Sequence, residues 1–272
     1  MQWRFLKSEL PVVGCNMIVN VGNLNSRKLG FHPGALKKLA RTGKAVLDLL
    51  IPSVCLHCGA RLFPTEKWLC GKCCSELPEL PEAVCAKCGS PQDPDFCPDC
   101  EEMQFVFEKA VAVYAYDGAA KTLIHALKYH NRTAVADWLA EKAFEKLDWD
   151  RPFAGAEVVT SIPLHKVRQR ERGYNQSALL AQALAKRMKL PFEPYLMVRK
   201  VYTTSQTTLS KAARLQNLKE AFRLGKSSLA GKKVLLVDDV FTTGTTVNEA
   251  AKVLLAGGAG SVYVLTICHG TL

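Results

Sequence analysis

Four Cys-x-x-Cys pairs between residues 55 and 100 constrain the fold of this chain more than any other feature. Two cysteines at this spacing can direct both sulfurs at one metal ion, so four pairs suit two closed, tetrahedral zinc sites. The pairs at 55–58 and 85–88 are both followed by glycine, which indicates one small unit used twice. We predict two structural zinc ions, held by Cys55, Cys58, Cys70 and Cys73 and by Cys85, Cys88, Cys97 and Cys100.

The spacing alone leaves the ligand sets open in three respects. Cys74 is adjacent to Cys73 and can replace it, His57 is an alternative ligand that we expect at the surface, and the pairs can combine crosswise. The stretch is rich in proline and poor in large apolar residues, so it needs metal to hold it together. Because no export signal precedes these pairs, we expect reduced thiols in a cytoplasmic protein rather than disulfides.

The length of 272 residues, of which 48% are hydrophobic, allows one full-sized core and a second small domain. No apolar stretch is long enough to span a bilayer, so we expect no membrane insertion. We predict an extension over residues 1–35, disordered or placed ahead of the true start. The next predicted domain, 36–103, consists of a helix at 36–50 followed by the double zinc ribbon. An α/β domain then spans 104–272.

From residue 104 onwards the sequence alternates short apolar runs with amphipathic stretches. Such alternation predicts a mostly parallel sheet with flanking helices and a ligand site at the carboxyl ends of the strands. The predicted strands span 105–116, 158–162, 195–198, 234–237 and 262–267. The predicted helices span 119–129, 134–147, 176–188, 211–222 and 248–255.

Basic residues are concentrated in one part of the chain. The formal net charge is +11, and residues 161–226 hold fourteen Lys and Arg against three Glu and no Asp. This segment suits an anionic partner, namely a polyphosphate, a nucleic acid or an acidic protein face, although a solvated basic surface gives the same pattern. We interpret Lys166, Arg168, Arg170 and Arg172 as part of a loop for pyrophosphate, although Arg168 and Arg170 can equally be exposed positions of a mobile loop.

The segment 233–247, KVLLVDDVFTTGTTV, is the most informative about chemistry. A buried strand fixes Asp238 and Asp239 at its end, and Thr242–Thr246 leads into a helix. The N–H groups of this loop and the positive end of the helix form a nest for phosphate, while the two acids can hold sugar hydroxyls or Mg²⁺. The alternative is an ordinary strand with a polar turn and a threonine helix cap.

This arrangement of apolar run, paired acids and Thr-Thr-Gly-Thr-Thr resembles the 5-phosphoribosyl-1-pyrophosphate (PRPP) signature of type I phosphoribosyltransferases. The resemblance implies that Asp238 and Asp239 hold the ribose hydroxyls, directly or through Mg²⁺. It implies that the 5′-phosphate is held by Thr242, Thr243, Gly244, Thr245 and Thr246. That family displaces pyrophosphate at ribose C1′ through an oxocarbenium-like state, which needs positioning and charge neutralisation.

Further motifs resemble the ComF family of competence-associated bacterial proteins. They comprise Pro52–Gly59, Tyr116–Gly118, Leu127–Tyr129 and the stretch from Pro163 to Gln176, which ends in Arg-Gly-Tyr-Asn-Gln. The resemblance covers about residues 40–268. It implies an α/β, type I phosphoribosyltransferase fold preceded by a double zinc ribbon. It also implies substrate or pyrophosphate contacts by Lys128, Arg168, Arg172, Asn175, Gln206 and Arg214, with Arg172 catalytic beside the acid pair. Lys128 can instead be a surface lysine, and Asn175 a helix cap.

Three classes of function fit these observations. The first is an enzyme that transfers phosphoribosyl, a pentosyl group, from PRPP to an unidentified acceptor. The second is a catalytically silent module that binds single-stranded DNA or a DNA-uptake motor or helicase through the zinc ribbons and the basic segment. The third is a scaffold for a partner, which the intact acids and phosphate loop disfavour. We predict a PRPP- and Mg²⁺-binding phosphoribosyltransferase-like protein of bacterial DNA uptake.

Overall fold

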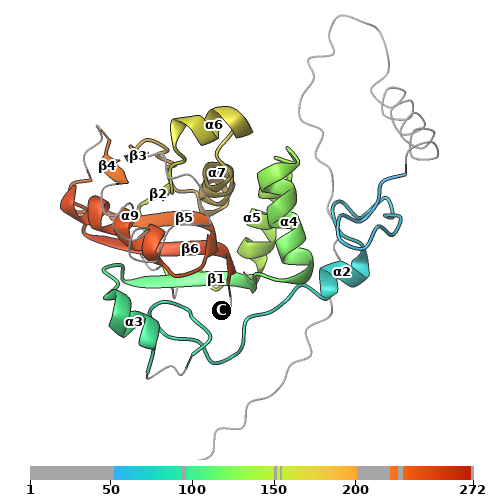
Figure 1. Ribbon diagram of the computed structural model, residues 1–272, viewed down its shortest axis with the longest axis horizontal. Helices are drawn as coiled ribbons and strands as arrows, with labels where there is room; N and C mark the ends of the chain where they lie inside the picture. Colours follow the sequence, from blue (N-terminus) through green and yellow to red (C-terminus); the bar gives the residue numbers. More distant parts are fainter. Residues whose placement is uncertain are drawn as a thin grey trace, which may run out of the picture. The chain divides into compact units, whose positions relative to one another are not determined.

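The computed structural model describes residues 52–92, 96–149, 152–153, 155–200, 221–225 and 229–270 (Figure 1). The chain forms two compact units that divide between Glu76 and Leu77, and each is described here by itself. The predicted extension over 1–35, the predicted helix over 36–50 and most of the predicted helix over 211–222 lie outside the described residues.

The described part of the first unit is a small ribbon around four cysteines. An antiparallel bridge joins Val54 to Arg61, and the helix α2, Gly71–Ser75, follows. The buried apolar side chains of this ribbon are few, namely Leu62, Leu69 and two of the cysteines. With so small a core, the ribbon depends on its cysteine cluster for stability.

The second unit is built on a four-stranded parallel sheet in the order β1-β6-β5-β2. Its strands are β1 Lys109–Ala115, β2 Val158–Ser161, β5 Lys233–Phe241 and β6 Ser261–His269. The two central strands, β5 and β6, carry long apolar runs because helices cover both faces of a parallel sheet. In β5 the fully buried run from Val234 to Val237 is followed directly by the two acids.

The helices of the two layers are α4 Gly118–Tyr129, α5 Val135–Lys146, α7 Gln176–Met188 and α9 Thr245–Ala256 (Figure 1). On one face of the sheet, α9 shares a buried apolar cluster with Val234 and Leu236 of β5. Since side chains alternate along a strand, Leu235 and Val237 face the opposite layer. There α7 packs against β5, β2 and α5, and α5 contacts α4.

A small antiparallel sheet pairs β3, Met197–Arg199, with β4, Phe222–Leu224, and both strands contact α9. The strand expected at 195–198 is therefore present, displaced toward its carboxyl end. The end of the helix predicted over 211–222 is wrong, because Phe222 lies in β4. Pairing with β3 and burial of the Phe222 ring decide the conformation there, which local propensity does not anticipate.

The segment between β2 and α7 forms the helix α6, Lys166–Arg172, where the sequence analysis predicts a loop. The Nδ1 atom of His165 accepts from the N–H of Val167 at 3.3 Å and so caps the first turn. Lys, Arg, Gln and Glu are good helix formers, and Gly173 ends the helix with a φ of 81°. The prediction of a loop is corrected: all four basic residues of this segment lie on a short helix.

The second cysteine cluster belongs to the second unit and ends in the helix α3, Pro98–Met103. Three of its cysteines lie in the same buried cluster as Phe105 and the apolar residues of α9. The N–H of Ala110 in β1 donates to the carbonyl of Lys87 at 2.7 Å. This ribbon is therefore built into the core of the α/β unit, while the domain limits at 35/36 and 103/104 stay predictions.

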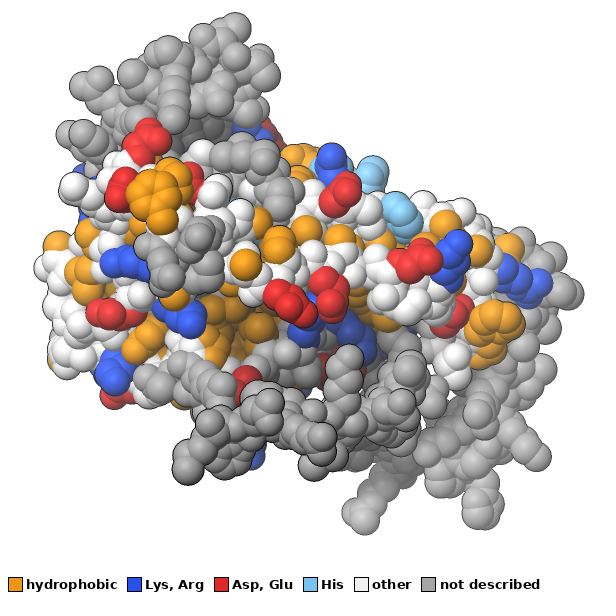
Figure 2. All heavy atoms as spheres, turned by 90° about the horizontal axis from the view of Figure 1, so that it is seen from below, with side chains coloured by type: hydrophobic (Ala, Val, Ile, Leu, Met, Phe, Trp, Pro, Cys, Tyr) orange, Lys and Arg blue, Asp and Glu red, His pale blue; other side chains and the backbone are white. Residues whose placement is uncertain are grey.

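The surface of the second unit mixes side chains of several kinds. On the face shown in Figure 2, acidic, basic and hydrophobic side chains are interspersed rather than segregated. Beside β1 lies a hollow of about 380 Å³ lined largely by apolar residues, including Leu80, Val84 and Pro152. Within the described ranges, no helix has the length and apolar character needed to cross a bilayer.

Candidate functional site

The two acids lie at the carboxyl end of β5, just past the point where β2 stops pairing with Val237. Oδ1 of Asp238 accepts a hydrogen bond from the Ser177 hydroxyl at 2.6 Å and from the N–H of Asp239 at 2.9 Å. Ser177 stands in the first turn of α7, so this helix fixes the orientation of the first carboxylate. The site is thus held from two secondary-structure elements.

Asp239 is 4% exposed and forms an ion pair with Lys128 of α4, whose Nζ lies 2.8 Å from Oδ1. Its other oxygen, Oδ2, is buried and has no hydrogen-bond partner among the described residues. Burial lowers the pKa of Lys128, but the charge and hydrogen bond of Asp239 outweigh this, and the pKa is raised. Lys128 is therefore a largely buried counter-ion of Asp239 rather than a surface lysine.

Burial and the nearby charge of Asp239 raise the pKa of Asp238 to about 7. The hydrogen bonds from Ser177 and from the Asp239 N–H, and the charge of Lys128, act in the opposite direction without overcoming burial. The acid pair consequently retains a proton near neutral pH. A cation or a set of hydroxyl donors placed beside it would favour the fully ionised pair.

The loop that follows β5 leads directly into α9. Thr242 and Thr243 are exposed, and the Oγ1 atoms of Thr243 and Thr245 lie 2.9 Å apart. The first N–H groups of α9, those of Thr245, Thr246 and Val247, have no acceptor within the helix, because intrahelical bonding begins one turn later. Free donors at the positive end of a helix suit a phosphate group.

Gly244 allows this loop to close. Its φ is 72°, in the left-handed region that favours glycine. A Cβ atom at this position would lie 2.5 Å from a ring carbon of Phe241 and 2.7 Å from one of Phe105. Both the backbone angle and the packed rings therefore require glycine, and the rings form an apolar floor beneath the loop.

A cavity of about 210 Å³ lies next to the acids and is strongly cationic. Its lining includes Lys128, which also pairs with Asp239 and so joins the cavity to the acid pair. The other lining residues are Tyr129, Leu164, His165, Arg168, Arg172, Gln176 and Arg199. Four positive side chains in so small a volume are suited to an anion with several charges.

Arg172 is held in place by two neighbours. Its Nη1 donates to Oε1 of Gln176, and its guanidinium lies 5.6 Å from the ring centroid of Tyr129. Two residues further on, Tyr174 donates its hydroxyl to the carbonyl of Leu127, which fixes the end of α6 to the end of α4. The Arg-Gly-Tyr-Asn-Gln motif thus shapes the wall of the cavity.

Arg199 is a cavity residue that sequence reasoning missed. It stands at the end of β3, with its guanidinium 5.5 Å from the ring centroid of Phe222 in β4. Burial lowers the pKa of Arg199, and the nearby charge of Arg168 acts in the same direction, while that of Asp238 raises it. Its place in the basic segment at the end of a predicted strand was the available signal.

The remaining predicted contacts are placed as follows. Asn175 caps α7: its Oδ1 accepts from the N–H of Ser177 at 3.1 Å, and its Nδ2 donates to the carbonyl of Ile162 at 2.9 Å. Its amide therefore has a structural role, and a contact with substrate stays a prediction. Gln206 and Arg214 lie outside the described residues.

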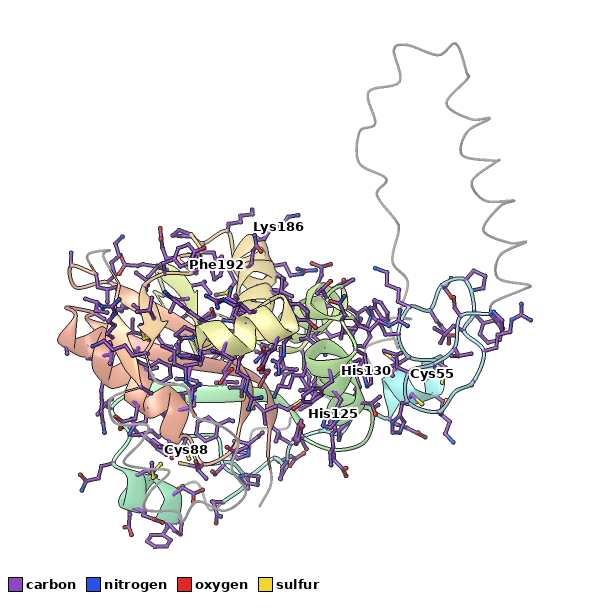
Figure 3. The ribbon with its side chains drawn as sticks, turned by 45° about the horizontal axis from the view of Figure 1, so that its top comes forward. Cys55, Cys88, His125, His130, Lys186 and Phe192 are labelled. Carbon is purple, nitrogen blue, oxygen red and sulfur yellow. The ribbon has the colours of Figure 1, made fainter. Side chains whose placement is uncertain are left out.

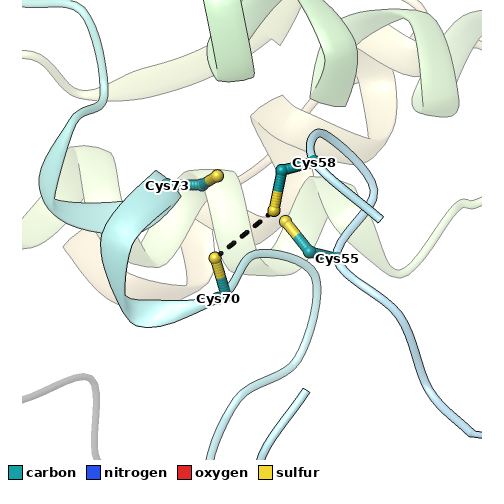
Figure 4. Close-up of side chains that lie close together, drawn as sticks. All are labelled: Cys55, Cys58, Cys70 and Cys73. Atoms are coloured by element: carbon teal, nitrogen blue, oxygen red, sulfur yellow. Dashed lines mark hydrogen bonds between the residues drawn. The ribbon is translucent and has the colours of Figure 1, made fainter. Parts of the chain in front are cut away.

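The eight predicted metal ligands form two groups, as their order in the sequence suggests. In each group all four Sγ atoms lie within 4.8 Å of one another. The Sγ atoms of Cys58 and Cys70 are 3.7 Å apart (Figure 4), and those of Cys85 and Cys100 are 3.6 Å apart. Sulfurs about 2.3 Å from a tetrahedral zinc ion are separated by about 3.8 Å, so both groups fit zinc.

The two clusters repeat the same local geometry. In the first, the N–H of Gly59 donates to Cys55 O, and in the second the N–H of Gly89 donates to Cys85 O, both at 3.0 Å. Both glycines have positive φ, 74° and 72°. The third cysteine of each cluster is the residue before a short helix, and the fourth lies in its first turn. Figure 3 marks one cysteine of each cluster.

Each group joins two neighbouring pairs, so the pairs do not combine crosswise in this structure. Cys74 and His57 are in neither group, and His57 is exposed as expected. Burial raises the pKa of Cys55, but hydrogen bonds from backbone N–H groups, that of Cys58 foremost, outweigh it and lower the pKa to about 6. Such backbone donors stabilise thiolates, the form of cysteine that binds metal.

Comparison with known proteins assigns both parts of the chain. A double zinc ribbon domain family matches residues 46–106, and a phosphoribosyl transferase domain family matches residues 175–270. The chain is 32% identical over 226 residues to the DNA utilization protein YhgH of Escherichia coli K12, covering 81% of this chain and 99% of that protein. It is 32% identical to competence protein F of Haemophilus influenzae, covering 77% and 94% of the two chains.

A third relative, competence protein ComFC of Bacillus subtilis, is 31% identical to this chain. The match covers 76% of this chain and 85% of that protein. These likenesses confirm the predicted fold class, a type I phosphoribosyltransferase fold preceded by a double zinc ribbon. The two four-cysteine clusters support two structural zinc ions. With fold, clusters and relatives in agreement, the chain belongs to the ComF family.

Proposed function

We propose that this protein binds PRPP with Mg²⁺ and transfers its phosphoribosyl group to an unidentified acceptor, in a process connected with DNA uptake. The observation that carries the proposal is the grouping of an acid pair, a threonine-rich loop at the start of α9 and a cationic cavity near the carboxyl end of β5. Relatives named for competence and DNA utilization supply the connection with DNA.

Each part of PRPP has a counterpart in this site. The N–H groups and hydroxyls of Thr242–Thr246 suit the 5′-phosphate. Asp238 and Asp239 suit the ribose hydroxyls, which are hydrogen-bond donors for carboxylates. The pyrophosphate suits the cavity, where Arg168, Arg172 and Arg199 present planar donor groups.

Mg²⁺ fits the chemistry of the donor set. Hard cations prefer carboxylate oxygens, and Oδ2 of Asp239 is buried without a partner while Asp238 carries a raised pKa. When bound, the ion would neutralise charge on the pyrophosphate oxygens. The protein's own residues supply the rest of the neutralisation through the cationic cavity.

The reaction is a substitution at C1′ of the ribose. The C1′–O bond to pyrophosphate breaks, and its electron pair leaves with the pyrophosphate. A lone pair of the acceptor forms the new bond to C1′, and the acceptor releases a proton to solvent. Positive charge develops on the sugar while negative charge develops on the leaving group, so Asp238 and the cavity arginines stabilise opposite ends of the transition state.

Calorimetric titration of the zinc-loaded protein with PRPP and Mg²⁺ tests the proposal. We expect saturable binding that is lost when Asp238→Asn and Asp239→Asn are combined, because the site then lacks its anionic oxygens. Asp137→Asn, which changes an exposed acid of α5, is the matched control and should bind as the wild type does. Absence of binding by folded, zinc-loaded wild-type protein would overturn the assignment.

The cavity is tested separately with Arg199→Ala. Loss of a charged donor to pyrophosphate should weaken PRPP binding about tenfold or more. The control is Arg223→Ala in the paired strand β4, where the side chain is exposed and Arg223 pairs with Val198. Equal affinities of the two variants would exclude the cavity as the pyrophosphate site.

A second candidate function is binding of single-stranded DNA. Tyr129 is 64% exposed at the rim of the cavity, with Arg172 over its ring and His125 edge-on at 5.4 Å (His125 is labelled in Figure 3). An exposed ring beside cationic side chains is a stacking platform for bases. Oligonucleotide binding that weakens with salt, and that Tyr129→Ala reduces but Tyr195→Ala does not, would favour this function.

A further inference from the structure

A short linking segment, residues 103–107, leads from the second cysteine cluster toward β1 and contacts the phosphate loop and the start of α9 on the way. It follows Cys100, the last cysteine of that cluster. The helix α3 ends at Met103, and Gln104 adopts a left-handed backbone with a φ of 46°, which turns the chain away from the helix axis. The next residues then enter the buried core of the α/β unit.

The first contact between this linking segment and the loop is made by Phe105. Its side chain is 5% exposed, stacks on Phe107 with ring centroids 4.8 Å apart, and meets Phe241 edge-on at 6.1 Å. A Cβ placed on Gly244 would lie 2.7 Å from the Phe105 ring. The ring therefore supports the backbone of the phosphate loop at its tightest point.

The second contact is made by Asn248, in the first turns of α9, which is 1% exposed. Its Oδ1 accepts from the N–H of Val106 at 2.9 Å, and its Nδ2 lies 3.5 Å from the carbonyl of Met103. Its own N–H donates to the carbonyl of Gly244 at 2.9 Å. One buried amide thus ties the linking segment to the start of the helix that bears the loop.

A second route joins the cluster to β5. Ser90, which follows Gly89, donates its hydroxyl to Oδ2 of Asp99 at 2.7 Å. Its Oγ also lies 3.5 Å from Nε2 of His269. The His269 ring stacks on Phe241 with centroids 5.1 Å apart. Phe241 is the last residue of β5, immediately before Thr242. The cluster is therefore connected to the loop through its amino-terminal and its carboxyl-terminal halves.

We infer that the second cysteine cluster positions the phosphate loop, with Phe105 and Asn248 as the positioning residues. Metal in this cluster fixes α3 and hence the linking segment, and the linking segment holds residues 242–248 in the conformation that exposes their N–H groups. The inference concerns the order of the loop; only its consequence for PRPP affinity rests on the proposed function.

Hydrogen exchange of the full-length, zinc-loaded protein tests the inference, with peptides spanning residues 241–250 as the readout. Cys100→Ser removes a ligand of the second cluster, and Cys58→Ser removes one of the first, in the other compact unit. With zinc content measured in both, we expect exchange in these peptides to rise about tenfold in Cys100→Ser only, as loss of about one hydrogen bond's stabilisation predicts. Equal exchange in the two variants would overturn the inference.

Asn248→Ala decides the matter if Cys100→Ser does not fold, since it leaves all eight cysteines in place. We expect two zinc ions per chain, faster exchange in residues 241–250 and weaker PRPP binding. The control on the same helix is Lys252→Ala, a surface change. Unchanged loop exchange in Asn248→Ala contradicts the inference. If the wild type binds no PRPP while exchange responds as expected, the proposed function fails and the positioning role stands.

Discussion

At the scale of single residues, the ion pair between Lys128 and Asp239 decides the electrostatics of the site. Both side chains are largely buried, 19% and 6% exposed, and they approach to 2.8 Å. A buried pair of this kind compensates the desolvation of both groups, so each partner is costly to remove alone. Lys128 also lines the cavity, so it is shared between the acid pair and any anion bound there.

Replacing Lys128 by methionine should lower the free energy of unfolding by about 3 kcal/mol, because Asp239 would remain as an uncompensated buried charge. Chemical denaturation measures the change. Lys121→Met on the same helix, at an exposed position, should have little effect. Adding Asp239→Asn to Lys128→Met should recover part of the loss, and a double variant less stable than the single one would refute this reading.

The raised pKa of Asp238 predicts how stability depends on pH. Its pKa of about 7 in the folded state exceeds its value in the unfolded chain, near 4, so the folded protein binds the extra proton between these values. The contribution of Asp238 to stability is present at low pH and is lost as the pH rises toward 7.

Denaturation of wild type and Asp238→Asn at several pH values between about 5.5 and 8 measures this contribution. The stability of the variant relative to wild type should rise with pH and level off above the folded pKa. Asp137→Asn, a change at an exposed acid, should leave a difference that does not vary with pH in this manner. A pH-independent difference for Asp238→Asn would show that its pKa is not raised.

At the scale of elements, the turn between β5 and α9 depends on Gly244 for two separate reasons, its positive φ and the rings against it. Gly173 at the end of α6 has a positive φ of 81° but open space where a Cβ would lie. The pair of glycines therefore separates the backbone requirement from the steric one.

Gly173→Ala should cost about 1 kcal/mol of stability, the penalty for a left-handed backbone at a non-glycine residue. Gly244→Ala should cost about 3 kcal/mol, because the rings of Phe105 and Phe241 must also move. Urea unfolding of both variants measures the difference. Equal losses would mean that the rings yield freely and do not support the loop.

Elements that are defined by local contacts and a regular pattern can be predicted from the sequence better than elements that depend on distant contacts. The helix over 176–188 was predicted to the residue, because Asn175 caps it locally and its apolar spacing is regular. The helix α6 was missed because its seven residues contain a single apolar side chain, so no periodicity marks it. The acids and the threonine-rich loop lie at the end of a buried strand as expected, because they are contiguous with an apolar run; their role in binding stays a prediction.

Non-local contacts account for what could not be foreseen. Arg199 reaches the cavity because two three-residue strands, β3 and β4, pair across a separation of more than twenty residues. The link between Ser90 and His269 spans 179 positions. No local pattern encodes either contact. The two groups of four cysteines, by contrast, follow the order of the Cys-x-x-Cys pairs along the sequence, as predicted.

At the scale of the whole molecule, the chain carries the same metal-binding unit twice, once in each compact unit. Each four-thiolate zinc site bears a charge of about −2, so two loaded sites reduce the formal net charge from +11 to about +7. Within the α/β unit, positive charge is concentrated in residues 161–226, the segment that supplies Arg168, Arg172 and Arg199 to the cavity.

The number of zinc ions per chain tests this organisation. Cys73→Ser should lower the zinc content from two ions to one, because Cys73 belongs to the first group of sulfurs. The neighbouring change Cys74→Ser should leave two ions, since Cys74 is outside that group. Elemental analysis of the purified variants provides the counts. Loss of zinc from Cys74→Ser would show that the adjacent cysteines exchange roles.

The incorporation of the second ribbon into the core has a consequence for evolution. Two copies of a repeated unit begin under equal constraint, but here one copy shares its neighbours with the sheet and with α9. A substitution near the first cluster must preserve metal binding and the packing of a small ribbon. One near the second cluster must also preserve its packing against the sheet, α9 and the loop. Among relatives, the first copy should therefore drift, or even disappear, more readily than the second.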